Sequence, residues 1–247
     1  MNNQDLPSTL SSLKDMIRCR KSVRSYKNEI VSPAILDALM AFLSSARALY
    51  PEIRVLPQIV SRRQVHCILP WTTSQLLAFY SEEAEGDLEN AGFLLQQTEL
   101  WLQSRGLGVC YLGMGRMDAA LAKKDGMRCV MLLSFGFPKG DGQRTLSQFR
   151  RRAPAEISDS PDPLLEPARL APSSVNSQPW YFIHEGEILH AYCAVQGLHR
   201  AISDMNRIDM GIALAHLYVE HPGSFRFFKV KNAPPISNRR YIGSFSL

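Results

Sequence analysis

The sequence predicts an α+β protein made of two similar halves. Two long segments have helical spacing, 88–104 and 207–219, and each carries a glycine near its start. Short alternating segments, including a hairpin over 181–195, predict mainly antiparallel strands. Between them, a stretch over 139–167 is rich in Pro, Gly, Ser and Asp, and the pattern then starts again. We therefore expect a first half over residues 1–158 and a second half over 159–247, packed as one compact unit.

The first half is expected to contain four helices and several short strands. Ser32 and Pro33 form a helix start signal, because serine caps and proline fits the first turn. Residues 88–104 are apolar on several faces, which predicts a central, buried helix. The predicted helices cover 11–19, 32–49, 88–104 and 117–126, and the predicted strands lie within 52–70, 71–81, 109–113 and 127–138.

The second half repeats this order with fewer elements. A short helix around Leu164, Leu165 and Leu170 leads to the hairpin, whose turn is expected at Glu185-Gly186. A second amphipathic helix follows over 206–221, and a strand over 224–230.

Composition limits the classes of protein. The chain has 45% hydrophobic and 21% charged residues, which is ordinary for a globular protein. No signal-peptide pattern and no bilayer-spanning apolar run is visible, so we expect a cytoplasmic protein without a membrane partner. The five cysteines are widely spaced and lack a C-x-x-C pair, which predicts neither a disulfide framework nor a metal site. The net charge of +5 is gathered in short clusters, which suit a small anion better than nucleic acid.

Two basic clusters are candidate anion sites. Arg20, Lys21, Ser22 and Arg24 combine cations with a hydroxyl, and an extended backbone would point Arg20, Ser22 and Arg24 to one side. Arg150 and Arg152 would likewise share a side of their segment. Either cluster alone is also compatible with a solvated charge run.

Two further motifs are compatible with a flat ligand. Prolines fix the loop "APSSVNSQPW", which offers Ser173, Ser174 and Asn176 after Pro172 and ends at a tryptophan. In "GLGVCYLGMG", the segment Gly113, Met114 and Gly115 would let backbone approach a ligand closely. The alternatives are a loop whose polar groups cap neighbouring helices, and glycines that only end a helix.

Together, "RKSVRSY", "GLGVCYLGMG", "FGFP" with "RRRAP", and "APSSVNSQPW" resemble the FMN-dependent nitroreductase family. The resemblance covers most of the chain and implies a three-layer α/β/α sandwich. In that family the serine-rich loop follows the first basic motif by a few dozen residues. Here that slot is degenerate and the intact loop lies in the second half, as in family members with two halves in one chain. The resemblance therefore implies that each chain is an internal pseudo-dimer with one FMN, and that a single chain can function as a monomer.

The resemblance also assigns roles to the motifs. Arg20, Lys21, Ser22 and Arg24 would hold the FMN phosphate and ribityl chain, and Arg150 and Arg152 would close on the phosphate. Pro172, Ser173, Ser174 and Asn176 would line the flavin from the other half. Gly113, Met114 and Gly115 would lie along the isoalloxazine ring, although Tyr111 replaces the tryptophan that is common in the family. No side chain is expected to be catalytic and no metal is expected.

The function implied by the resemblance is an FMN-dependent NAD(P)H oxidoreductase. It would reduce nitroaromatics, quinones or similar small electron-poor acceptors in a ping-pong hydride transfer, with NADH or NADPH as the donor. Two alternatives remain open: a flavin-binding or electron-shuttling protein with little turnover, and a basic protein that binds nucleic acid. A purified protein that keeps the yellow colour of flavin but does not oxidise NAD(P)H would favour the first alternative. A colourless protein that binds DNA in a salt-sensitive way would favour the second.

Overall fold

The structure is a computed structural model that describes residues 5–195 and 200–247. Six α-helices and eleven strands alternate along this part of the chain. The helices are α1 (Asp5–Ile17), α2 (Pro33–Ser45), α3 (Asp87–Ser104), α4 (Pro154–Ile157), α5 (Glu166–Leu170) and α6 (Arg200–Glu220). The strands are β1 (Val55–Ser61), β2 (Val65–His66), β3 (Gln75–Ser81), β4 (Gly108–Tyr111), β5 (Arg116–Met117), β6 (Lys123–Lys124), β7 (Met127–Gly136), β8 (Trp180–Glu185), β9 (Ile188–Ala194), β10 (Arg226–Phe228) and β11 (Arg239–Ser246).

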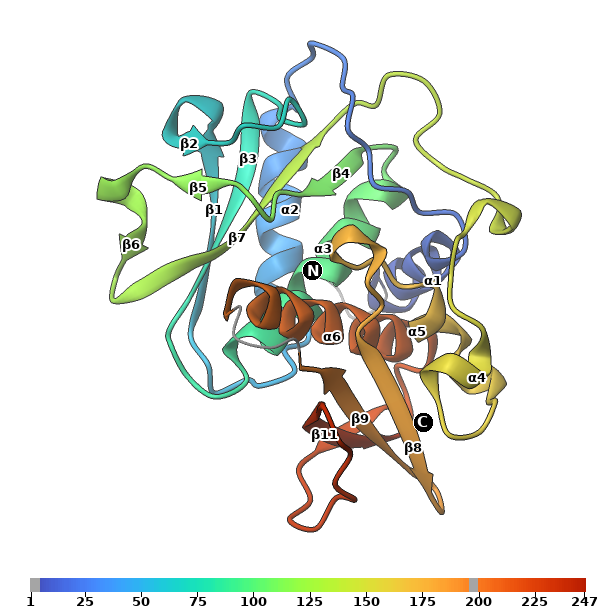
Figure 1. Ribbon diagram of the computed structural model, residues 1–247. Coiled ribbons are helices and arrows are strands. Elements are labelled where there is room, and N and C mark those ends of the chain that lie inside the picture. The colour runs from blue at the N-terminus through green and yellow to red at the C-terminus, as the bar shows by residue number, and fades with distance from the viewer. Residues whose placement is uncertain (1–4, 196–199) are drawn as a thin grey trace.

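The strands form two main antiparallel sheets with the same connectivity. The first has the order β1-β3-β7-β4, with β6 as an extra partner of β7, and the second has the order β8-β9-β11-β10. In each sheet two strands precede a long helix, α3 or α6, and two strands of the shared order follow it, with β6 as an addition in the first sheet (Figure 1). The α+β class with mainly antiparallel sheets is therefore confirmed.

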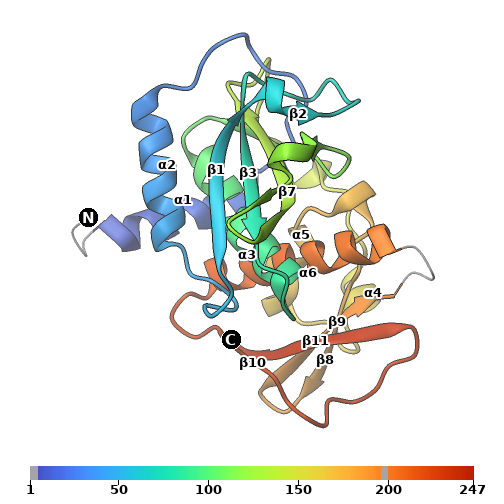
Figure 2. The same cartoon turned by 90° about the vertical axis from the view of Figure 1, so that its left-hand side faces the viewer.

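The long helices α3 and α6 form the centre of the molecule. They lie between the two sheets, so the layers run from the first sheet through the helices to the second sheet (Figure 2). The long helices are therefore inside, whereas an α/β/α sandwich would have them outside the strands. Residues 87–103 of α3 are all buried, although they include several polar side chains. The helix is buried all round because α1, α2, α6 and the first sheet cover its different sides.

Two glycines set the crossing of α3 and α6. A Cβ atom on Gly92 would lie 2.0 Å from the carbonyl oxygen of Ile208, and one on Gly211 would lie 1.9 Å from that of Glu89. Only glycine permits such a close approach of two helix backbones. The contact is reciprocal: each glycine faces the residue that precedes the other glycine by three positions. The glycine near the start of each predicted helix therefore has a packing role.

Most predicted elements are present. Helix α1 starts earlier than predicted, at Asp5, and β11 was not predicted. The turn of the β8–β9 hairpin is Gly186-Glu187, one residue later than predicted, because Glu185 still pairs with Ile188 and the left-handed position with φ of 60° is Gly186.

The helix predicted over 117–126 is wrong. Only 119–121 form a single 3₁₀ turn, while β5 pairs with β2 and β6 pairs with β7. Asp125 and Gly126 connect β6 to β7 with φ values of 51° and 78°. This Asp-Gly pair is the two-residue hairpin signal, which outweighs the helical propensity of the alanines and lysines before it.

Two further observations concern the whole described chain. None of its helices is both long and apolar enough to cross a membrane. All five cysteines are free thiols.

Candidate functional site

Residues 139–167, which follow β7, are called the connector below. Residues 20–24, called the clamp segment below, lie extended between β4 and this connector. The Gln103 side chain on α3 accepts from the Lys21 amide and donates to the Lys21 carbonyl, both at 3.2 Å. Ser22 forms a bridge with Val109 of β4, and Arg20 forms one with Gln143 of the connector. These bonds on both sides explain why the chain stays extended after α1 ends.

Arg20 of this segment forms a buried ion pair with Glu99 of α3. Both side chains are 1% exposed, and the distance between Arg20 Nη2 and Glu99 Oε1 is 2.7 Å. Arg20 also donates from Nη2 to Ser22 Oγ at 3.1 Å, so Arg20 and Ser22 share one side of the segment. The second carboxylate oxygen of Glu99 is buried without a hydrogen-bond partner.

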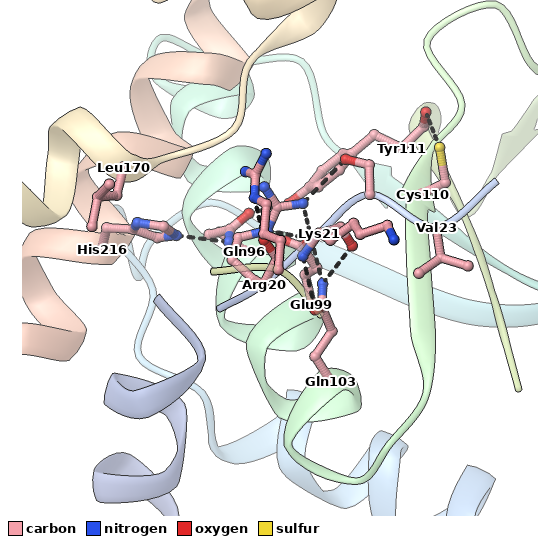
Figure 3. A network of polar contacts seen from close by, with 12 residues as sticks. Arg20, Lys21, Val23, Gln96, Glu99, Gln103, Cys110, Tyr111, Leu170 and His216 are labelled. Atoms are coloured by element: carbon pink, nitrogen blue, oxygen red, sulfur yellow. Dashed lines mark hydrogen bonds and ion pairs between the residues drawn. The ribbon is translucent and has the colours of Figure 1, made fainter. Parts of the chain in front are cut away.

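A polar stripe on α3 connects this ion pair to the interior (Figure 3). Gln96, Glu99 and Gln103 are spaced so that they lie on one face of the helix. Gln96 accepts from the hydroxyl of Tyr111 at 3.1 Å and contacts His216 of α6 at 2.9 Å. Burial lowers the pKa of His216 to about 3, and its other nitrogen lies 2.9 Å from the Pro167 carbonyl. His216 is thus a buried core histidine with a partner for each ring nitrogen.

Arginines of the connector add positive charge beside Arg20. Arg144 donates from Nε to the Arg20 carbonyl at 2.9 Å, and both Arg144 and Arg151 pack on the ring of Phe149. Burial and neighbouring cations, Arg20 among them, lower the pKa of Arg144 to about 10 and that of Arg151 to about 9. The Nε of Arg151 is buried without a partner. We call Arg20, Arg144 and Arg151 the arginine cluster. Its three positive charges exceed the single negative charge of the Glu99 carboxylate.

The other predicted cations point elsewhere. Lys21 donates from Nζ to the Asp141 carbonyl at 2.8 Å, and Arg24 is exposed with its guanidinium 4.6 Å from the centre of the Trp71 ring. Arg150 and Arg152 are exposed. The residue between them, Arg151, is the one that lies near Arg144 and Arg20.

The loop over residues 172–178, called the covering loop below, is bonded directly to this arginine run. Asn176 accepts from Arg151 Nη1 at 2.8 Å and donates to the Arg150 carbonyl at 3.0 Å. Gln178 accepts from the Arg152 amide at 2.8 Å. Val175, Asn176 and Gln178 all have left-handed backbones, with φ of 45°, 58° and 48°. A β-branched residue is strained in that region, so these bonds hold the loop in a costly conformation.

Helix α6 brings the covering loop and the glycine segment over 113–115 together. A Cβ atom on Gly113 would lie 3.3 Å from Met205 Cε, and the Ser174 amide donates to the carboxylate of Asp209 at 3.0 Å. Met205 and Asp209 are one turn apart on the same face of α6. Beside them, Met114 and Val175 are 53% and 96% exposed.

The predicted site residues therefore fall into two groups. The structure gathers the clamp segment, the glycine segment, the arginine run and the covering loop around α6 and α3, but four predicted cations face away from Arg20. The sequence reasoning missed Glu99, Gln103, Arg144, Arg151 and Asp209 as members of the site. The spacing of polar residues on an otherwise apolar α3 was the available signal for the first two.

Comparisons with known proteins identify the family of this chain. A family model described as "Putative TM nitroreductase" matches residues 12–221. The chain belongs to this nitroreductase family. Membership supports an oxidoreductase, and no curated protein matches the sequence.

Solved structures are similar to this nitroreductase family member at low identity, and the first of the three below shares its fold. A "putative nitroreductase" from Thermotoga maritima has a TM-score of 0.64 and 18% identity, over 97% of this chain and 93% of that chain. An FMN-dependent nitroreductase from Clostridium difficile has a TM-score of 0.44 and 13% identity, over 57% of this chain and 98% of that chain. Nitroreductase A from Vibrio parahaemolyticus has a TM-score of 0.43 and 15% identity, over 59% of this chain and 73% of that chain.

The residues of this family member fit the phosphate end of a flavin nucleotide. Three guanidiniums gather around one carboxylate, and Arg151 Nε is a buried donor without an acceptor. Such an excess of donors and positive charge favours an additional anion. The glycine segment and the covering loop lie next to it on α6, where an apolar ring system would be in contact with Met114 and Val175.

Proposed function

We propose that the protein is an FMN-dependent NAD(P)H oxidoreductase that reduces nitroaromatics, quinones or similar electron-poor acceptors. The observation that carries the proposal is the arginine cluster with the unpaired Nε of Arg151, beside a covering loop held on α6. Membership of a nitroreductase family supports the same reaction class.

In this proposal Arg151 and Arg144 bind the phosphate, together with the hydroxyl of Ser22. Arg20 is 1% exposed and paired with Glu99, so it orients Ser22 rather than serving as the main ligand. Lys21, Arg24, Arg150 and Arg152 reach the phosphate only if their side chains turn from their present partners. Bound FMN would supply the hydride chemistry, which no side chain of the cluster provides.

We also propose that the chain is an internal pseudo-dimer with one flavin site. The equal strand orders and the reciprocal glycines support two equivalent halves. The loop before β1 is anchored to α3 as the covering loop is anchored to α6: Asn90 accepts from the amides of Leu49 and Tyr50 at 2.9 and 3.1 Å. There the Tyr50 ring packs on Gly86 and lies 5.5 Å from that of Phe227, so aromatic side chains occupy the position equivalent to a second flavin.

The first test is a titration with FMN followed by visible absorption, then by NADH or NADPH without oxygen. We expect one FMN per chain and bleaching of the flavin band by the nicotinamide. Replacement of Arg151 by Met should weaken FMN binding by at least about tenfold, since a buried charged hydrogen bond is lost. Arg150→Met is the matched control, because its side chain is exposed, and should change affinity much less.

The remaining outcomes separate the alternatives. Bound flavin that NADH and NADPH do not bleach would support the binding or electron-shuttling protein instead. No bound FMN at any concentration tested would contradict the proposal. Equal losses in Arg151→Met and Arg150→Met would contradict the assignment of Arg151.

A further inference from the structure

Asp209 lies beneath the covering loop and is 3% exposed. Both of its carboxylate oxygens are near the Ser174 amide, at 3.1 and 3.0 Å. Ser174 begins the short turn that contains the strained Val175, so this contact fixes the loop where it bends over α6. Asp209 is therefore the anchor of the covering loop on α6.

A buried carboxylate usually needs a cation. Among the side chains that the structure describes, no lysine or arginine forms an ion pair with Asp209. An isolated buried charge is very costly, and such a group binds a proton instead. Asp209 therefore has the environment of a neutral carboxylic acid rather than of a carboxylate.

The first half of the chain contains a natural comparison. Asn90 precedes Gly92 by two positions, as Asp209 precedes Gly211, and it anchors the loop before β1 through a neutral amide oxygen. A neutral side chain is thus sufficient to hold such a loop. The acid at Asp209 differs from this amide in one property: it can lose a proton.

Two titratable groups on described strands interact electrostatically with Asp209. They are Tyr111 of β4 and Cys193 of β9, and burial raises the pKa of Tyr111 well above its usual range and that of Cys193 to about 12. Both stay neutral below pH 9. Burial raises the pKa of Asp209 to about 8, with the Ser174 amide and the Ser177 hydroxyl opposing the change. On the far side of the loop, Arg151 remains a cation below its pKa of about 9.

We propose that Asp209 is a positioning residue that holds the covering loop as a protonated acid, and that its ionisation releases the loop. The ionised group needs water, and water reaches it only if the loop above it moves. The strained backbone of Val175, Asn176 and Gln178 favours this movement once hydration of the ionised carboxylate outweighs its hydrogen bond with the loop. The consequence for FMN rests on the proposed function: FMN binds more weakly as the loop opens.

The first test uses the protein without flavin. Because the folded pKa of Asp209 lies above the unfolded value of 3.8, the folded state keeps a proton that the unfolded state has lost. Stability therefore falls as pH rises from about 4 to about 8 and then levels off. We expect the urea midpoint of the wild type to fall between pH 5.5 and 8.5 relative to that of Asp209→Asn. The control Asp37→Asn, an exposed acid on α2, should follow the wild type.

The second test measures FMN affinity by flavin fluorescence at pH 6.5 and 8.5. A pKa of about 8 predicts that the wild-type Kd rises about fourfold, and that Asp209→Asn shows no such rise. If no FMN binds at either pH, the proposed function fails, while the urea test still decides the role of Asp209. Parallel pH profiles of the wild type and Asp209→Asn in both tests would overturn the proposal. Should Asp209→Asn fail to fold, a ¹³C NMR titration of the Asp209 carboxyl in the wild type decides: a pKa below 5 contradicts the proposal.

Discussion

Glu99 is the only carboxylate that forms an ion pair with Arg20 among the described residues, at a distance of 2.7 Å between Oε1 and Nη2. Removing one partner of a buried pair leaves the other charge without compensation, which costs about 3–5 kcal/mol. We expect Glu99→Gln to lower the free energy of unfolding by this order, measured by urea denaturation. Glu82→Gln is the control, because the Glu82–Arg54 pair is exposed and should contribute little. Similar losses in the two variants would contradict a special role of burial.

The same substitution should act in the opposite direction on anion binding. Glu99 reduces the positive potential of the arginine cluster, so its neutralisation strengthens the attraction for phosphate. We expect Glu99→Gln to bind FMN or inorganic phosphate more tightly, on the order of tenfold, at a temperature where the variant is folded. Isothermal titration calorimetry at low salt measures this. Weaker binding by a folded Glu99→Gln would show that Glu99 orients the cations rather than opposing the anion.

The crossing of α3 and α6 predicts a strong steric effect. A methyl group on Gly211 would lie 1.9 Å from the Glu89 carbonyl oxygen, so Gly211→Ala must separate the two central helices. We expect a loss of at least about 3 kcal/mol, the upper part of the range for overpacked cores. Gly223→Ala is the matched control, since nothing lies within 4 Å of its added Cβ. A Gly211→Ala protein with the urea midpoint of the wild type would contradict the crossing.

His184, near the end of β8 in the second sheet, should make the free energy of unfolding depend slightly on pH. It lies 2.7 Å from Asp159 and 3.2 Å from Asp162, which both face it from the connector. Burial lowers its pKa, but the hydrogen bonds to the two carboxylates outweigh this effect and the pKa is raised above 6.5. Its contribution to stability is therefore complete below pH 6.5 and is lost as pH rises through the raised value. Since the group is partly exposed, we expect less than about 1 kcal/mol.

The measurement for His184 compares the wild type with His184→Gln. The difference in urea midpoint should be largest near pH 5.5 and shrink toward pH 8.5. His221→Gln serves as the control, because His221 follows α6 without an ion pair among the described contacts. A difference that grows with pH would contradict the assignment.

The fold was largely predictable from the sequence because its long elements have strong periodicity. The buried α3 and the amphipathic α6 follow from apolar spacing, and the β8–β9 hairpin from alternation around a glycine. The segment over 117–126 was not, since its alanines and lysines favour a helix, whereas β5 pairs with the distant β2 and β6 turns back onto the adjacent β7. Strand pairing, both local and distant, outweighs the helical propensity there.

The site was predictable as a set of segments but not as a set of side chains. Motifs identified the clamp segment and the covering loop, yet alternation alone could not decide whether Arg151 or its neighbours would face Arg20. That choice depends on how the connector bonds to Asn176 and Gln178, which are contacts across 25 or more residues. Similarly, Asp209 becomes part of the site only because α6 passes under the covering loop.

The reciprocal contact of Gly92 and Gly211 has an evolutionary consequence. In an assembly of two identical subunits, every substitution appears at both symmetry-related positions, so a change that improves one site alters the other. One chain with two unlike halves is free of this coupling, provided that the helix crossing is kept. The loops anchored by Asn90 and Asp209 differ in this chain: one packs Tyr50 against Phe227, and the other exposes Val175 to solvent. The molecule can thus specialise one side as a scaffold while the other side adapts to its ligand.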